Sequence, residues 1–132
     1  MQQQEKRIVP LLVVLFDQLF KFFALRLNLA TINYGLGWGI FSSSFTQPLF
    51  LIFIILGSLF IINHLFPKYF GKATALELII GGGFSNLIDR VFRGGVVDYL
   101  HLPLIPSFNL ADFAITVGFL VLFKEILPDK GL

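Results

Sequence analysis

Long apolar stretches alternate with shorter polar ones along the chain. The apolar stretches cover residues of about 8–27, 48–66, 73–92 and 108–127. Each has the length of a spanning helix, because ~20 residues rising ~1.5 Å each cross a hydrocarbon core of ~30 Å. Pro67 and Pro128 follow two of them and favour helix ends there. The pattern predicts an all-α membrane protein with four transmembrane helices in a single domain, residues 1–132.

The segments between the apolar stretches predict the topology. Residues 28–47 are polar and rich in Gly and Ser, with a weak alternation that predicts a small β-like segment, and residues 94–107 predict a loop. Six basic residues fall on one side of the predicted bundle: Lys6, Arg7, Lys68, Lys72, Lys124 and Lys130. Three fall on the other: Arg26, Arg90 and Arg93. This bias predicts a multi-pass protein of the cytoplasmic membrane with both termini in the cytoplasm.

The first apolar stretch is also similar to a secretory signal peptide, since Lys6 and Arg7 precede it. Asp17 and Lys21 interrupt it, however, and no small-residue cleavage site follows it. We therefore expect a retained first span.

Composition narrows the function classes. The chain is 56% hydrophobic and only 14% charged, which is too apolar to cover the surface of a small soluble domain. It has no cysteine, so disulfides and a thiolate nucleophile are excluded. The net charge of +2 is too small and too scattered for a nucleic-acid partner.

Polar side chains inside the apolar stretches are the candidates for chemistry, because charges in a membrane are costly. Under the predicted topology they gather at the outer leaflet from three spans, and Asp98 joins them from the 94–107 loop. The members from the spans are Asp17, Lys21, Asn86, Asp89, Arg90, Asn109 and Asp112. Glu77 lies near the cytoplasmic end, where we expect an interfacial side chain.

Asp98 and Asp112 are the pair best suited to catalysis. They flank a 13-residue connection that can bring them together at the mouth of a helical hairpin. In such a pair an ionised carboxylate takes a proton from water while a protonated one polarises a carbonyl. Ser85, in a glycine-rich run, and the distant pair His64 and His101 support neither a serine hydrolase nor a metal site. No cofactor or metal is expected.

Two charged pairs keep alternative interpretations at this point. Asp17 and Lys21 are four residues apart, so they either neutralise each other to hold the bundle together or support the site. Asp89 and Arg90 favour a structural role over a catalytic one. The glycines 81–83 indicate close helix packing.

Four sequence blocks, in order, resemble the lipoprotein signal peptidases (signal peptidase II), the bacterial membrane aspartyl proteases. The blocks are Asp17-Gln18-x-x-Lys21, Asn33-Tyr34-Gly35-Leu36-Gly37-Trp38, Gly81 to Arg90 with Val96-Val97-Asp98-Tyr99, and Phe108-Asn109-Leu110-Ala111-Asp112. Three features depart from the family pattern. Trp38 replaces a usual Phe, Ser85 stands where Gly is usual, and both outer segments are shorter.

The resemblance implies that Asp98 and Asp112 are the catalytic dyad of an aspartic endopeptidase. It implies that other polar residues line or support the site: Asp17, Lys21, Asn33, Gly35, Asn86, Asp89, Arg90 and Asn109. It also implies the substrate, a prolipoprotein whose cysteine carries a diacylglyceryl group and which is cut just before that cysteine. We expect a monomer that also contacts membrane lipid. The alternatives are a small proton- or ion-coupled transport component and an inactive binding relative.

Overall fold

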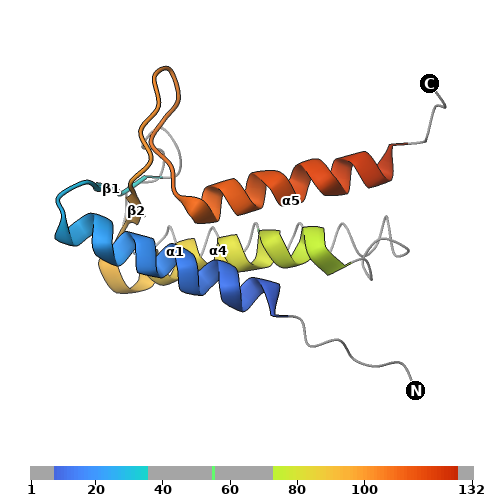
Figure 1. Cartoon of the computed structure of the whole chain (residues 1–132), viewed down its shortest axis with the longest axis horizontal. Coiled ribbons are helices and arrows are strands. Elements are labelled where there is room, and N and C mark those ends of the chain that lie inside the picture. The colour runs from blue at the N-terminus through green and yellow to red at the C-terminus, as the bar shows by residue number, and fades with distance from the viewer. Residues whose placement is uncertain (1–7, 36–54, 56–72, 128–132) are drawn as a thin grey trace.

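The computed structural model describes residues 8–35, 55 and 73–127 (Figure 1). Its elements are helix α1 (Val9–Arg26), strand β1 (Thr31–Asn33), helix α4 (Ala73–Arg93), strand β2 (Val96–Asp98) and helix α5 (Leu110–Ile126). Three of the four predicted helices are therefore present, within two residues of their predicted bounds. The remaining predicted helix, at residues 48–66, lies outside the described residues apart from Ile55.

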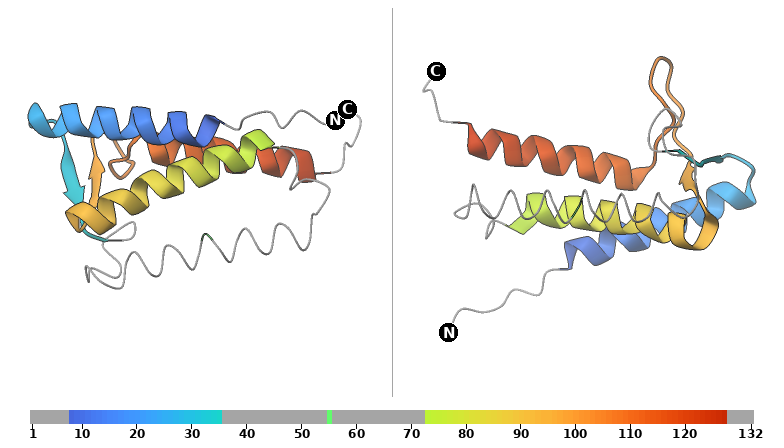
Figure 2. Two further views of the ribbon diagram at one scale, coloured as in Figure 1. Left: turned by 90° about the horizontal axis from the view of Figure 1, so that it is seen from below. Right: turned by 180° about the vertical axis from the view of Figure 1, so that it is seen from behind.

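The three helices lie side by side, with α4 in contact with both α1 and α5 (Figures 1 and 2). Small residues allow this close approach. A Cβ atom on Gly82 would lie 2.4 Å from the carbonyl oxygen of Ala111, and one on Gly118 would lie 2.6 Å from that of Ala75. Any side chain at Gly82 or Gly118 would push α4 and α5 apart, so the predicted glycine packing surface is confirmed.

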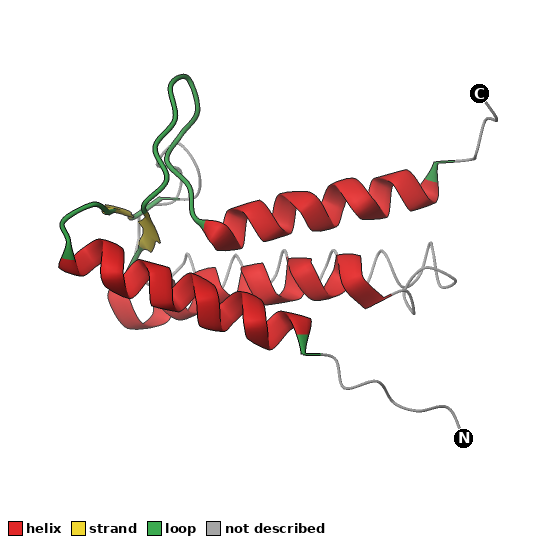
Figure 3. Cartoon of the chain, viewed as in Figure 1, coloured by secondary structure: helices red, strands yellow, loops and turns green. Residues whose placement is uncertain are grey.

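A two-stranded antiparallel sheet closes one end of the bundle (Figure 3). Thr31 lies opposite Asp98, Ile32 opposite Val97, and Asn33 opposite Val96. The predicted β-like segment after the first helix is confirmed as β1. The prediction of a loop throughout 94–107 is wrong, because β2 occupies part of it. Three residues carry too little pattern for a strand to be predicted; they are a strand because β1 pairs with them.

The interior of the bundle holds charged side chains beside a small apolar core, and its outside is apolar. Asp17, Lys21 and Asp89 have 0% of their surface exposed, whereas Leu11 is 70% exposed and Phe123 62%. A water-soluble fold has the reverse arrangement. The described helices therefore hold a buried charged cluster inside an apolar coat.

Glu77 differs from its prediction. Only 6% of its surface is exposed, so the expectation of an interfacial side chain is wrong.

Within 8–35 and 73–127, none of the helices combines the length and the apolar character needed to cross a membrane. The four-span organisation stays a prediction.

Candidate active site

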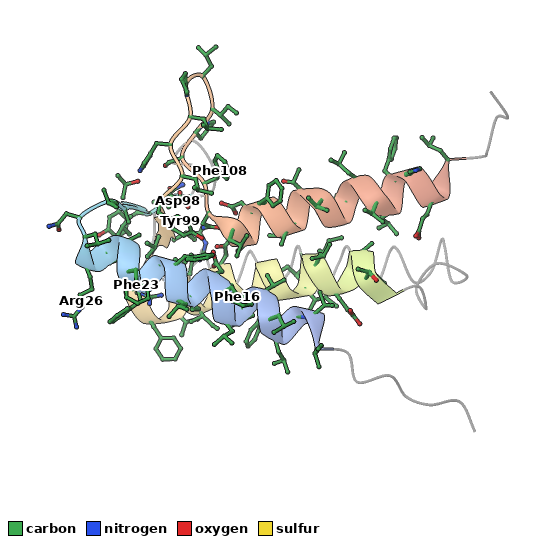
Figure 4. The ribbon with its side chains drawn as sticks, in the orientation of Figure 1. Phe16, Phe23, Arg26, Asp98, Tyr99 and Phe108 are labelled. Atoms are coloured by element: carbon green, nitrogen blue, oxygen red, sulfur yellow. The ribbon has the colours of Figure 1, made fainter. Side chains whose placement is uncertain are left out.

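The two candidate catalytic carboxylates meet where the sheet joins α5. Asp98 is the last residue of β2, and Asp112 lies in the first turn of α5. The side-chain amide of Asn109 donates to Oδ1 of Asp98 at 3.0 Å, and its backbone N–H donates to Oδ2 of Asp112 at 3.2 Å. One residue thus binds both carboxylates. Figure 4 shows Asp98 at this end of the bundle, beside Tyr99 and Phe108.

The start of α5 is held by three different side chains. Asn109 is the N-cap, and its side-chain oxygen accepts from the backbone N–H of Asp112 at 2.9 Å, which completes a capping box. The N–H of Leu110 donates to the hydroxyl of Tyr99 at 3.0 Å, and that of Ala111 donates to Oδ1 of Asp17 at 3.1 Å. The first N–H groups of a helix have no partner within the helix, so these contacts fix where α5 begins.

Lys21 lies at the centre of the buried cluster. Its Nζ atom is 2.6 Å from Oδ2 of Asp17 and 2.8 Å from Oδ2 of Asp89. It also donates to Oδ1 of Asn86 at 3.1 Å, and the amide of Asn86 donates to Oδ1 of Asp112 at 2.8 Å. The predicted Asp17–Lys21 pair is confirmed. Because Asn86 binds both Lys21 and Asp112, this pair also connects to the dyad.

Asp89 has the contacts of a structural carboxylate. It accepts from Gln18 at 2.9 Å and from the backbone N–H of Val97 at 3.0 Å, and it pairs with Arg93 one turn along α4. Asp89 therefore attaches both α1 and β2 to α4.

Arg90 connects α4 to the residues that follow β1. Arg90 donates to the carbonyl oxygen of Gly35 at 3.0 Å, and the N–H of Gly35 donates to the side chain of Asn33 at 2.9 Å. The side chain of Asn33 also hydrogen-bonds Asp98. Asn33 thus contacts Asp98 directly, and Gly35 is connected to it through Asn33.

Three further members of this cluster were not predicted to belong to the site. Ser85 has no exposed surface, and its hydroxyl donates to Oδ2 of Asp17 at 2.6 Å. Gln18 donates to that same hydroxyl at 3.0 Å, and Tyr99 donates to Oδ1 of Asp17 at 3.1 Å. Gln18 and Tyr99 stand inside the quoted sequence blocks, and Ser85 was a visible departure from them. Their places in or against these blocks were the sequence signal that could have identified them as site residues.

Burial sets the protonation of the groups outside the helices. Burial, followed by the nearby charge of Asp112, raises the pKa of Asp98, while Lys21, Asn33 and Asn109 lower it, and the net result is a pKa of about 7. Asp98 therefore holds a proton for part of the time at neutral pH. Burial also raises the pKa of Tyr99 above its usual value, so its hydroxyl stays neutral and can donate to Asp17.

Two other features bear on the site, an apolar groove and the histidine His101. A groove of about 330 Å³ between α1 and α5 is lined only by apolar side chains, among them Phe16, Phe20 and Phe113, so it offers space but no acid or base. His101 is exposed, and its Nε2 lies 3.3 Å from the carbonyl oxygen of Leu29. Among the residues that the structure describes, no group of three or more His, Cys, Asp and Glu side chains could hold a metal ion.

Comparison with known proteins adds independent evidence. The model of the family described as Signal peptidase (SPase) II matches residues 9–127. The lipoprotein signal peptidase of Geobacillus thermodenitrificans is 36% identical over 108 residues, which is 75% of this chain and 68% of the relative. That of Bacillus subtilis is 34% identical over 104 residues, with the same two shares. A solved bacterial membrane enzyme superposes with a TM-score of 0.70 at 27% identity and covers 94% of this chain and 88% of its own.

Proposed function

The chain belongs to the signal peptidase II family, and we propose that Asp98 and Asp112 are the catalytic dyad with which it cuts its substrate. It is an aspartic peptidase of the bacterial membrane that cleaves the signal peptides of prolipoproteins. The observation that carries the dyad is the double contact of Asn109, which donates to a carboxylate oxygen of each aspartate.

The environments of the two aspartates support different roles in the reaction. Asp98, with a pKa raised to about 7, holds the shared proton and donates a hydrogen bond to the carbonyl oxygen of the scissile peptide. Asp112 accepts from Asn86 at 2.8 Å and from Asn109 at 3.2 Å. Those donors orient the carboxylate of Asp112, which acts as the base that takes a proton from the attacking water.

The proposed reaction needs no covalent intermediate. The water oxygen bonds to the carbonyl carbon as Asp112 takes its proton and as the carbonyl oxygen receives the proton of Asp98. The tetrahedral intermediate then collapses: the carbon–nitrogen bond breaks, Asp112 gives its proton to the leaving nitrogen, and Asp98 recovers its own. Both carboxyl groups end in their starting states, so one dyad turns over repeatedly.

The other predicted site residues support this dyad by position and charge. Asn86 and Asn109 orient its carboxylates. Asn33 hydrogen-bonds Asp98, and the carbonyl oxygen of Gly35 accepts a hydrogen bond from Arg90. Asp17, Lys21 and Asp89 form the buried ion cluster beneath it. Their contacts favour the site-supporting interpretation, in which they set the geometry without touching the substrate.

The substrate we propose is a prolipoprotein with a diacylglyceryl-modified cysteine, cut just before that cysteine. A site at the outer leaflet of a four-span monomer, with both termini in the cytoplasm, suits it because the lipid keeps the scissile bond near the membrane surface. The exposed aliphatic and aromatic side chains of the helices support contact with membrane lipid. The family comparisons favour this peptidase over the transport component and over an inactive relative.

A cleavage assay on a diacylglyceryl-modified prolipoprotein tests the dyad. Asp98→Asn and Asp112→Asn should each lower kcat/KM by roughly 10³-fold or more, and the double variant should be no worse, because the two residues act as a unit. Both variants should unfold at nearly the wild-type temperature. The matched control is Asp89→Asn, which should lower stability more than turnover per folded molecule. Near wild-type turnover by either dyad variant would show that the assignment is wrong.

A further inference from the structure

The connection from β2 to α5 forms a hairpin with an apolar tip, here called the 99–108 hairpin. Its base is fixed by the bridge between Leu100 and Phe108, whose backbone groups exchange hydrogen bonds of 2.9 and 3.0 Å. Between these residues the chain carries no Asp, Glu, Lys or Arg. Figure 1 shows that the hairpin projects sideways from the bundle, across the direction of the helices, and the second view in Figure 2 agrees.

The tip presents large aliphatic side chains to its surroundings. Leu104 is 106% exposed, Ile105 56% and Leu102 53%. Leu104 has a φ of 68°, in the left-handed region that a residue with a side chain seldom adopts. Glycine would be the less strained choice for this turn. A leucine held there, fully exposed, indicates that the side chain itself has a use outside the described bundle.

The position of the hairpin points to lipid as the material it contacts. It leaves the bundle at the end that carries the dyad, since Asp98 and Asp112 flank it on either side. Arg26 ends α1 at this same end (Figure 4). Its guanidinium lies 5.1 Å from the centre of the Phe22 ring. An arginine that packs on an aromatic ring while keeping its charge exposed is typical of the boundary between lipid and water.

We propose that the 99–108 hairpin is an interfacial anchor that inserts Leu102, Leu104 and Ile105 among the acyl chains of the outer leaflet. A hairpin that projects sideways at the membrane boundary lies along the bilayer surface instead of rising into water. Its tip is then buried to the shallow depth that apolar side chains reach at an interface. This inference rests on the proposed function, in which the dyad lies at the outer leaflet.

The anchor would fix the depth of the dyad. A substrate held by a diacylglyceryl group presents its scissile bond at a set distance from the acyl chains. An enzyme that cuts that bond gains from a matching contact of its own, because misplacement by about 1 Å can cost roughly 10²-fold in rate. Since the hairpin joins the two catalytic elements directly, its depth is transmitted to both aspartates.

The absence of native cysteines allows a direct test by single-cysteine labelling. The full chain with Leu104→Cys, labelled with the fluorophore NBD, is reconstituted in phosphatidylcholine–phosphatidylglycerol vesicles without substrate. We expect blue-shifted emission and strong quenching by lipids that carry a doxyl group high on the acyl chain. The matched control is Thr31, an exposed residue at the same end of the bundle. A label at Thr31→Cys should remain in water. Leu15→Cys, on the exposed outer face of α1, gives the reference signal of a label deep in the lipid.

Two outcomes would overturn the anchor. One is NBD emission typical of a label in water from Leu104→Cys, both with and without substrate. The other is a blue shift only after lipidated prolipoprotein is added, which would show that the tip contacts the substrate. The labelling needs no catalysis, so it remains decisive even if the proposed dyad fails.

A kinetic test measures the consequence for the reaction. Leu104→Asp should raise KM roughly tenfold for prolipoprotein embedded in vesicles, because a charged tip is excluded from lipid. It should change KM little for the same substrate in detergent micelles, where depth is not fixed. The control variant Leu104→Met keeps the apolar tip and should match the wild type in both. Equal effects of Leu104→Asp in vesicles and micelles would contradict a role in setting depth.

Discussion

Lys21→Met tests whether one buried cation holds the charged cluster together. Methionine keeps the length and volume of the lysine side chain but removes its charge and its three contacts, at 2.6 Å to Asp17, 2.8 Å to Asp89 and 3.1 Å to Asn86. Both carboxylates would then lose their shared cation at a site with no solvent exposure. Removing one partner of a buried ion pair costs about 3–5 kcal/mol. That is a large share of the ~5–15 kcal/mol by which domains are stable.

The structure also indicates which carboxylate would be harmed more. Asp89 keeps its pair with Arg93, whereas Asp17 keeps only neutral donors among its described contacts. Adding Asp17→Asn to Lys21→Met should therefore recover about 2 kcal/mol, since it removes the uncompensated charge. Thermal unfolding in detergent micelles measures all four members of this cycle. A cost below about 1 kcal/mol for Lys21→Met, or an Asp17→Asn change that adds to the cost, would refute the reasoning.

Two further predictions concern single hydrogen bonds. Ser85→Ala removes the 2.6 Å hydrogen bond to the Asp17 carboxylate and should destabilise the protein by about 1–2 kcal/mol. This is the value of a hydrogen bond to a charged group, reduced by the better helix propensity of alanine. The control is Thr116→Ala, at an exposed hydroxyl that bonds its own helix, which should change the free energy of unfolding by less than ~0.5 kcal/mol. Asn33→Ala removes a bond that lowers the pKa of Asp98, so this pKa should rise above about 7 and the enzyme should keep its shared proton to higher pH. The alkaline limb of the kcat/KM profile should then move upward, and an unmoved limb would exclude Asn33 from setting the proton.

The helices of this fold were predictable because long apolar stretches carry a strong signal. The bounds of α1, α4 and α5 follow directly from where apolar residues begin and end. Spacing alone also predicted the Asp17–Lys21 pair, because residues four apart share a helix face. These are local relationships, and each can be determined within one helix.

The contacts between helices were not predictable from single segments. Glu77 was expected at an interface from its place near a helix end, yet the packing of neighbouring helices buries it. Asp89 and Arg90 are adjacent in sequence, but Asp89 faces Lys21 while Arg90 faces the carbonyl of Gly35. Strand β2 exists because β1 pairs with it. Each outcome depends on how two distant segments cross, and no periodicity within one segment encodes that.

The site and the start of α5 are one structure, which explains why the dyad can be held so firmly by so small a protein. Asp112 is both a candidate catalytic carboxylate and the acidic member of the capping box, and Asn109 is both the N-cap and the donor to Asp98. The helix N-terminus also carries a partial positive charge, which favours an ionised carboxylate in its first turn. Asp17 also binds this helix terminus, because its carboxylate accepts from the N–H of Ala111. Lys21 pairs with Asp17 and offsets its charge. The contacts of α5 and its N-cap with α1 and β2 therefore position both candidate catalytic carboxylates and their supporting amide.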